Sequence, residues 1–231
     1  GYLASQKWDG SSWSATTTLD KLYNSNDSVY RSFDLEYENG TDRAILVSRG
    51  ARNVDPPFYA IWDNGSWSAT TSIDIPLVSA PRFIELASQR FSTSTRIAMI
   101  VVDVNSDIYG MEWDGDSWND LGVSVAWDCC ASSATKKVVD VAYESASGAA
   151  LFAWGNLGSL VYYRRWDGAA FTASTTLDVG GVPEWIRLAP NYYSATSTIM
   201  LGSYDATNDI NLSLWGGSSF GAVTEPDFNN E

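Results

Sequence analysis

The chain has 231 residues, which is enough for one domain with a large core. Its 11 Trp, 12 Tyr, 8 Phe and 18 Gly make a composition that is typical of strands and turns and disfavours a helical bundle. There are 14 Lys and Arg against 28 Asp and Glu, so the formal net charge is -14. An acidic chain is a poor partner for nucleic acid or an anionic membrane surface. The sequence contains no His, the commonest general base and zinc ligand.

A turn that contains tryptophan recurs five times along the chain. The leading Trp residues are 54, 51, 53 and 49 positions apart, which is a near-constant period. Asp-Gly and Asn-Gly favour the positive φ angles of tight turns, and the flanking aromatic residues suit strands, so each copy predicts a β-hairpin. The copies are Trp8–Trp13, Trp62–Trp67, Trp113–Trp118, Trp166–Phe171 and Trp215–Phe220.

Two further strands precede each of the last four hairpins. The nearer one is continuously apolar, at 44–47, 97–102, 149–154 and 199–201, which predicts burial on both faces. The farther one alternates between apolar and charged residues, at 33–35, 84–86, 139–141 and 186–188. One repeat is therefore four antiparallel strands.

Four strands per repeat of about fifty residues predict an all-β fold, a β-propeller of four-stranded antiparallel blades. We expect a single domain over 1–231 with about five blades, the first incomplete, or a part of a larger ring. The half blade is 1–20, and the full blades are 29–78, 79–126, 134–180 and 182–228. Because Gly1 is no initiator Met, we expect a trimmed chain. Upstream residues, another segment or another subunit would complete the ring, and the open edge of the first blade is a pairing surface.

The first strand of each repeat also carries paired charges. Residues three apart on a strand point to opposite faces, so each charge is predicted to meet one on a neighbouring blade. These residues then form salt bridges between blades or line an axial channel for a charged ligand or cation, and the sign reversal in the last repeat favours salt bridges. No metal-binding motif is present, so no cofactor is expected and Ca²⁺ has no motif to support it. The pairs are Arg31 and Asp34, Arg82 and Glu85, Lys137 and Asp140, and Glu184 and Arg187.

The hairpin repeat resembles that of bacterial propeller lectins of the Photorhabdus lectin type. Residues 107–122 carry a Tyr-containing strand, a Trp-Asp-Gly-x-x-Trp turn and a Leu-Gly ending. The resemblance spans the chain, is clearest in the hairpins, and implies a seven-bladed ring that binds fucosides or related sugars in clefts between blades. The chain departs from that pattern because only the third copy ends in Leu-Gly and the last copy lacks the Asp. A looser resemblance, to the sialidase Asp-box turn, implies no catalysis, because the Asp-box is itself a folding motif.

The repeated Trp and Asp residues are the candidate sugar-binding groups. Pyranose C–H faces stack on Trp, and hydroxyl groups bind fixed carboxylates. The alternative is that the Trp residues pack blades together while each Asp caps its turn. Aromatic residues outside the repeat, Tyr23, Trp127, Tyr192 and Tyr193, are further candidates. The repeated set is Trp8, Asp9, Trp62, Asp63, Trp113, Asp114, Trp166, Asp167 and Trp215.

The sequence thus predicts a non-catalytic propeller, extracellular or at the cell surface, that binds glycans or other surface polymers between its blades. The alternative is a structural or adhesive subunit of a surface layer or filament, which binds protein or copies of itself through its open blade edge. Neither nucleic acid nor a membrane span is expected, because no apolar run is long enough to cross a bilayer. The adjacent Cys129 and Cys130 form a vicinal disulfide, a link to another chain or two free thiols.

Overall fold

The computed structural model describes residues 2–21, 32–50, 56–75, 79–121, 136–193 and 196–226, and the side chains from Tyr2 to Leu19 in the first range. Within these ranges all the regular elements are β-strands. They form antiparallel sheets that follow one another in chain order. The all-β prediction is therefore confirmed. Residues Tyr23, Arg31, Trp127, Cys129 and Cys130 lie outside the described ranges.

The first two sheets contain the first two tryptophan hairpins. The first sheet pairs β1 (Tyr2–Ser5) with β2 (Thr17–Lys21). In the segment that connects these two strands, Trp8 and Trp13 pair with each other in an isolated bridge. The second sheet contains β3 (Phe33–Tyr37), β4 (Ala44–Arg49), β5 (Pro57–Asp63), β6 (Ser66–Trp67) and β7 (Thr71–Ser72). Here β6 and β7 both pair with β5, so together they form the fourth strand of the repeat.

The remaining three sheets repeat this order. The third contains β8 (Pro81–Ser88), β9 (Ile97–Asp103), β10 (Ile108–Trp113) and β11 (Trp118–Asp120). The fourth contains β12 (Val139–Tyr143), β13 (Ala150–Gly155), β14 (Leu160–Trp166) and β15 (Thr175–Asp178). The fifth contains β16 (Pro183–Pro190), β17 (Thr198–Asp205) and β18 (Ile210–Gly216). Bridges from Leu212 to Thr224 and from Trp215 to Phe220 stand where its fourth strand is expected.

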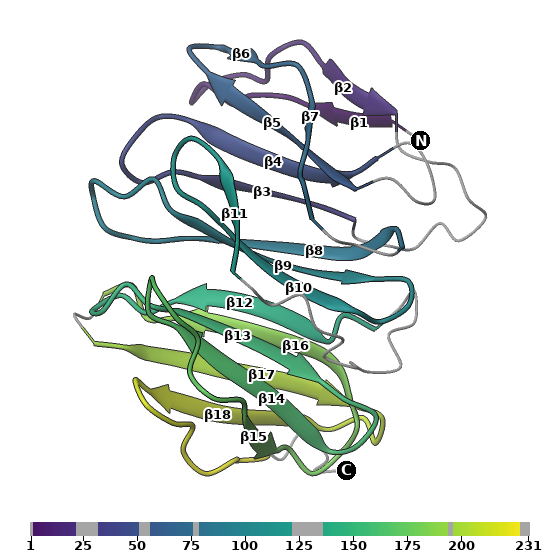
Figure 1. Cartoon of the computed structure of the whole chain (residues 1–231), viewed down its shortest axis with the longest axis vertical. Coiled ribbons are helices and arrows are strands. Elements are labelled where there is room, and N and C mark those ends of the chain that lie inside the picture. The colour runs from purple at the N-terminus through teal and green to yellow at the C-terminus, as the bar shows by residue number, and fades with distance from the viewer. Residues whose placement is uncertain are drawn as a thin grey trace.

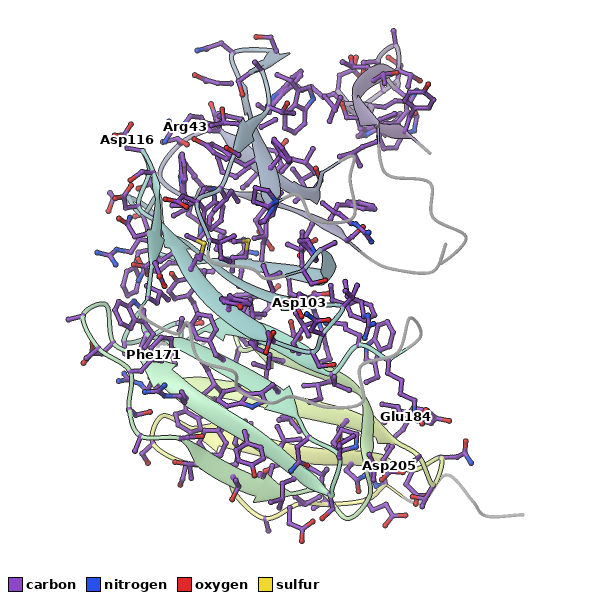
Figure 2. The ribbon with its side chains drawn as sticks, turned by 45° about the vertical axis from the view of Figure 1, so that its right-hand side comes forward. Arg43, Asp103, Asp116, Phe171, Glu184 and Asp205 are labelled. Carbon is purple, nitrogen blue, oxygen red and sulfur yellow. The ribbon has the colours of Figure 1, made fainter. Side chains whose placement is uncertain are left out.

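The sheets stack face to face, as Figure 1 shows from the purple β1–β2 to the yellow-green β16–β18. The first strands of the full sheets, β3, β8, β12 and β16, contact one another in chain order. Strands β4, β9 and β13 are buried along their whole length, as their apolar sequences predict. Figure 2 places Arg43, Asp116 and Phe171 at one edge of the stack and Asp103, Glu184 and Asp205 at the other.

A carboxylate of one sheet holds an indole of the next sheet at the junction of the second and third sheets. Glu38 follows β3 and is 1% exposed, and its Oε1 accepts a hydrogen bond of 2.6 Å from Nε1 of Trp113. Arg43 donates to both carboxylate oxygens, through Nε at 2.9 Å and Nη2 at 2.7 Å, and Thr41 donates as well. Arg43 also donates to the carbonyl of Gly115 on the third sheet at 2.7 Å. The buried carboxylate is thus paired on every side and ties the two sheets together.

Glu144 repeats this arrangement between the fourth and fifth sheets. Nε1 of Trp215 donates to its Oε1 at 2.8 Å, and Nε of Arg165 donates to the same oxygen at 2.9 Å. The hydroxyl of Ser147 donates to Oε2. Burial alone would raise the pKa of Glu144, but the bonds from Arg165, Ser147 and Trp215 outweigh it and lower the pKa.

The junction of the third and fourth sheets is built differently. Gln89 stands where the other two sheets have glutamate, and its Nε2 donates to the carbonyl of Gly148 at 2.6 Å. Nε1 of Trp166 is buried and has no hydrogen-bond partner within the described ranges. The hydroxyl of Tyr143 donates instead to Glu112 of the third sheet at 2.8 Å. The same repeated Trp therefore has different partners at different junctions.

Replacing Glu38 with Ala should leave the indole N–H of Trp113 without its acceptor and the guanidinium of Arg43 without its carboxylate partner. We expect the free energy of unfolding, measured by urea titration, to fall by about 2–4 kcal/mol. The exposed turn residue Asp116 supplies the control, because Asp116→Ala should change that free energy by less than about 0.5 kcal/mol. Equal losses in the two variants would show that the Glu38 group does not hold the sheets.

Glu144→Gln tests the second junction through its pH dependence. A carboxyl whose folded pKa lies below the ordinary value of 4.5 stabilises the protein above that value, and the stabilisation is lost as the pH falls toward the folded pKa. The free-energy difference between wild type and Glu144→Gln should therefore be full near neutral pH and shrink below the ordinary pKa. A difference that stays constant on acidification contradicts the assignment.

Candidate functional site

Three of the repeated aspartates are bound by their own turns. Oδ1 of Asp9 accepts bonds from the backbone N–H groups of Ser11 and Ser12, both at 2.8 Å. Asp114 and Asp167 accept equivalent pairs of bonds at 2.8–2.9 Å. These backbone bonds lower the pKa of all three carboxyls. The carboxylates therefore cap turns, and their main partner is the chain itself.

Asp63 belongs to a different kind of turn. Its hairpin reverses at Asn64 and Gly65, whose φ angles are 48° and 86°, and Asp63 pairs with Ser66 across the ladder. Two positive φ angles in succession are typical of a two-residue hairpin turn. Asp63 lines a recess together with Lys7, Tyr37 and Trp62.

The repeated tryptophans differ widely in exposure. Trp113 is 0% exposed and Trp215 is 2% exposed, and both donate to the glutamates described above. Trp166 is partly buried and packs against Phe171 with ring centroids 5.0 Å apart. Trp8 is 49% exposed, and Trp62 is partly buried like Trp166. Ring faces that a ligand can reach therefore lie mainly near the first and second sheets.

A cleft of about 290 Å³ lies between these two sheets, at the lower end of the range for small-molecule sites. Trp62 and Trp67 meet at its wall with ring centroids 5.6 Å apart. Nε1 of Trp67 donates to Oγ of Ser5 on β1 at 2.9 Å, which fixes the indole across the junction. Nζ of Lys7 lies 5.9 Å from the centre of the Trp62 ring. The lining is Ser5, Gln6, Lys7, Trp8, Ser14, Thr17, Leu35, Tyr37, Ala44, Trp62 and Trp67.

The cleft and the neighbouring recess share Lys7, Tyr37 and Trp62, so they form one surface, here called the first cleft. It offers aromatic faces, an ammonium group, hydroxyl groups and, at its outer end, the side chains of Asp42 and Asp63. Apolar walls with a few polar groups are typical of sites for small polar ligands such as sugars. The structure thus brings Trp8, Trp62 and Asp63 together and places the other six members of the predicted set elsewhere.

Charges of the first strands meet near the middle of the stack. Nζ of the buried Lys137 lies 3.1 Å from Glu85 of the third sheet and 3.5 Å from Asp140 of its own sheet. Residues three apart on one strand would point to opposite faces, yet Lys137 contacts Asp140. The reason is that Lys137 precedes β12 and forms only an isolated bridge, with Trp185. Burial raises the pKa of Asp140, although Lys137 and Arg187, 3.5 Å away, oppose the shift.

The other predicted charges have separate partners. Within the described ranges, no group of three or more Asp, Glu, Cys or His side chains is placed to hold a metal ion. Oδ2 of Asp34 accepts a bond from the N–H of Leu86 (2.9 Å), Arg82 donates to the carbonyl of Val104 (3.0 Å), and Glu184 pairs with Lys136 (2.6 Å).

Tyr192 and Tyr193 lie after β16, far along the chain from the first cleft. Tyr193 is fully exposed, and the guanidinium of Arg90 lies 4.6 Å from the centre of the Tyr192 ring. No helix in the described part of the chain is long and apolar enough to cross a membrane.

Sequence reasoning did not identify Lys7 or Tyr37 as site residues. Tyr37 has a detectable signal, because it continues the alternation of Phe33 and Leu35 and therefore shares their face of β3. Lys7 has none, since the residue before Trp in the other copies is Ile, Glu, Arg or Leu.

No family model matches the chain, and no curated protein matches it by sequence. Solved structures match it by fold. A lectin of Aleuria aurantia, described as a six-bladed β-propeller with a novel mode of fucose recognition, is 15% identical with a TM-score of 0.58, over 96% of this chain and 70% of that one. SapL1 lectin in complex with α-methyl fucoside is 15% identical with a TM-score of 0.56, over 97% and 71%.

BP39L lectin from Burkholderia pseudomallei is 10% identical with a TM-score of 0.60, over 94% of this chain and 60% of that one. At these identities the likeness establishes the fold, and it confirms the β-propeller prediction. The particular likeness to the Photorhabdus lectin type stays a prediction. The chain is a β-propeller of four-stranded antiparallel blades, and its described sheets are similar to those of propeller lectins.

Proposed function

We propose that the chain is a non-catalytic glycan-binding propeller whose first cleft holds a sugar. The observation that carries the proposal is the juxtaposition, between two blades, of the Trp62 and Tyr37 rings with the ammonium group of Lys7. An indole face excludes water from the C–H face of a pyranose, while Lys7 and nearby hydroxyl groups bind the sugar hydroxyls.

Fucosides are the proposed ligand class. The structural neighbours support this choice, since the Aleuria aurantia lectin and SapL1 are described with fucose or a fucoside. A 6-deoxy sugar also presents a methyl group, which is suited to an apolar wall such as that formed by Leu35 and Trp62. Lys7 and Asp63 then select the arrangement of hydroxyl groups.

The number of sites should be smaller than the number of repeats. Trp113 and Trp215 are buried and bound to glutamates, so their faces are closed to a sugar. A repeated turn therefore does not mean a repeated site. We expect one principal site in the described part of the chain, and any avidity arises from multiple copies of the protein.

The proposal includes a location outside the cell or on its surface, where such glycans are displayed. The alternative role, a structural or adhesive subunit, is supported by β1, which pairs with β2 along one edge only within the described sheets. We favour glycan binding, because the first cleft offers a built set of aromatic and polar groups.

Isothermal titration with methyl α-L-fucoside, preceded by a glycan array, tests the proposal. Trp62→Ala removes the stacking face, so we expect affinity to fall at least about tenfold. Trp185→Ala is the matched control, because Trp185 is 42% exposed and lies on the fifth sheet.

The control variant should bind as the wild type does, and thermal melts should show that both variants remain folded. Absence of binding to every sugar of the array, or equal losses in Trp62→Ala and Trp185→Ala, would overturn the proposal.

A further inference from the structure

The sequence contains two Asn-Gly pairs, Asn39-Gly40 and Asn64-Gly65. In such a pair the backbone nitrogen of the glycine can attack the side-chain amide carbon of the asparagine, because glycine has no Cβ to obstruct the approach. The attack needs a glycine N–H without an acceptor and an amide side chain that is free to rotate. The two pairs are equal in sequence, so their surroundings decide which of them reacts.

Asn39-Gly40 is fixed against the third sheet. Nδ2 of Asn39 donates to the carbonyl of Gln89 at 2.8 Å, and the N–H of Gly40 donates to the carbonyl of Ser94 at 2.6 Å. A Cβ on Gly40 would lie 2.6 Å from the backbone of Thr93, so this glycine is packed tightly. The nitrogen that would attack and the amide that would be attacked are therefore both held by other residues.

Asn64-Gly65 has none of these contacts. It forms the exposed turn between β5 and β6. Neither the side chain of Asn64 nor the N–H of Gly65 has a hydrogen-bond partner in the described part of the chain. A Cβ on Gly65 would meet no atom within 4 Å. This pair thus combines a free nitrogen with a free amide.

The turn also has access to the conformation that the attack requires. The φ angles of 48° at Asn64 and 86° at Gly65 fit a type I′ turn. Ring closure needs a different Cα–C torsion at Asn64, close to that of a type II′ turn. Both turn types have a positive φ at the first position, so a flip of the Asn64–Gly65 peptide converts one into the other while Asp63 and Ser66 stay paired. The hairpin does not have to open.

We propose that Asn64 is a site of spontaneous deamidation whose only co-reactant is water. The nitrogen of Gly65 bonds to Cγ of Asn64, and Nδ2 leaves as ammonia together with the proton that the Gly65 nitrogen gives up. The product is a five-membered succinimide ring. Water then opens the ring at either carbonyl, which yields aspartate or isoaspartate at this position. Neither step oxidises or reduces the chain.

The modification alters the first cleft, and this consequence rests on the proposed function. Asn64 and Gly65 line the outer part of the cleft beside Asp63. Either product adds a negative charge there. Isoaspartate also adds an extra backbone atom between Trp62 and Trp67, which pair across the hairpin and line the cleft. We therefore expect the affinity for sugar to fall as the protein ages.

Peptide mapping by mass spectrometry tests the proposal in the wild-type protein. After incubation at mildly alkaline pH, the peptide with Asn64 should convert at least about tenfold faster than the peptide with Asn39. The chain in guanidinium chloride is the control, because unfolding frees both pairs and both should then convert at similar rates. A folded protein in which Asn64 stays unconverted would overturn the proposal, and so would equal conversion of the two pairs in the folded protein.

Asn64→Gly is the matched variant, since Gly-Gly also suits this turn and has no side-chain amide. Aged wild type should lose affinity for methyl α-L-fucoside in proportion to the fraction converted, whereas aged Asn64→Gly should bind as fresh wild type does. Conversion with no loss of affinity would overturn the link to the first cleft. Absence of sugar binding in fresh protein would overturn the proposed function and leave the mass measurement unaffected, so the two proposals fail separately.

Discussion

The stack of sheets depends on the burial of both faces of its middle sheets, the third and the fourth. Strands such as β9 are apolar on both sides, so a single sheet would expose a hydrophobic surface to water whichever way it turned. Stacking resolves this, and the stack then needs polar contacts that fix how one sheet sits on the next. The bonds from Trp113 to Glu38 and from Trp215 to Glu144 supply that registration, because each buried donor has one well-placed acceptor.

The fold is readable from the sequence because its signals are local and repeated. The Asp-Gly turns, the period near fifty residues and the doubly apolar strands all lie within single repeats. The structure contains the hairpins, and strands 44–49 and 97–103 are buried throughout. The weakest repeat is the last, where the sequence predicts a fourth strand and the structure has two isolated bridges.

The candidate site was harder to predict, because it depends on contacts between repeats. Trp62 and Trp113 stand in nearly the same motif, yet Trp113 is buried and hydrogen-bonded to Glu38, whereas Trp62 lines a cleft. The acceptor that distinguishes Trp113, Glu38, lies on the preceding sheet and not in the motif itself. One sequence signal does exist. A Tyr-Glu pair stands at the end of the first strand in the second and fourth sheets, as Tyr37-Glu38 and Tyr143-Glu144. The glutamate of each pair binds the repeated Trp of the next sheet. Lys7 has no such signal, since its proximity to Trp62 follows only from the packing of the first two sheets.

The unequal surroundings of the repeated tryptophans have an optical consequence. Trp113 and Trp215 lie in dry sites with bonded N–H groups, and Trp8 lies in a site open to water. We therefore expect the emission spectrum of the protein to be a sum of blue-shifted and red-shifted populations. A soluble collisional quencher would reach the second population first, so the protein carries its own separate reporters of its interior and of its first cleft.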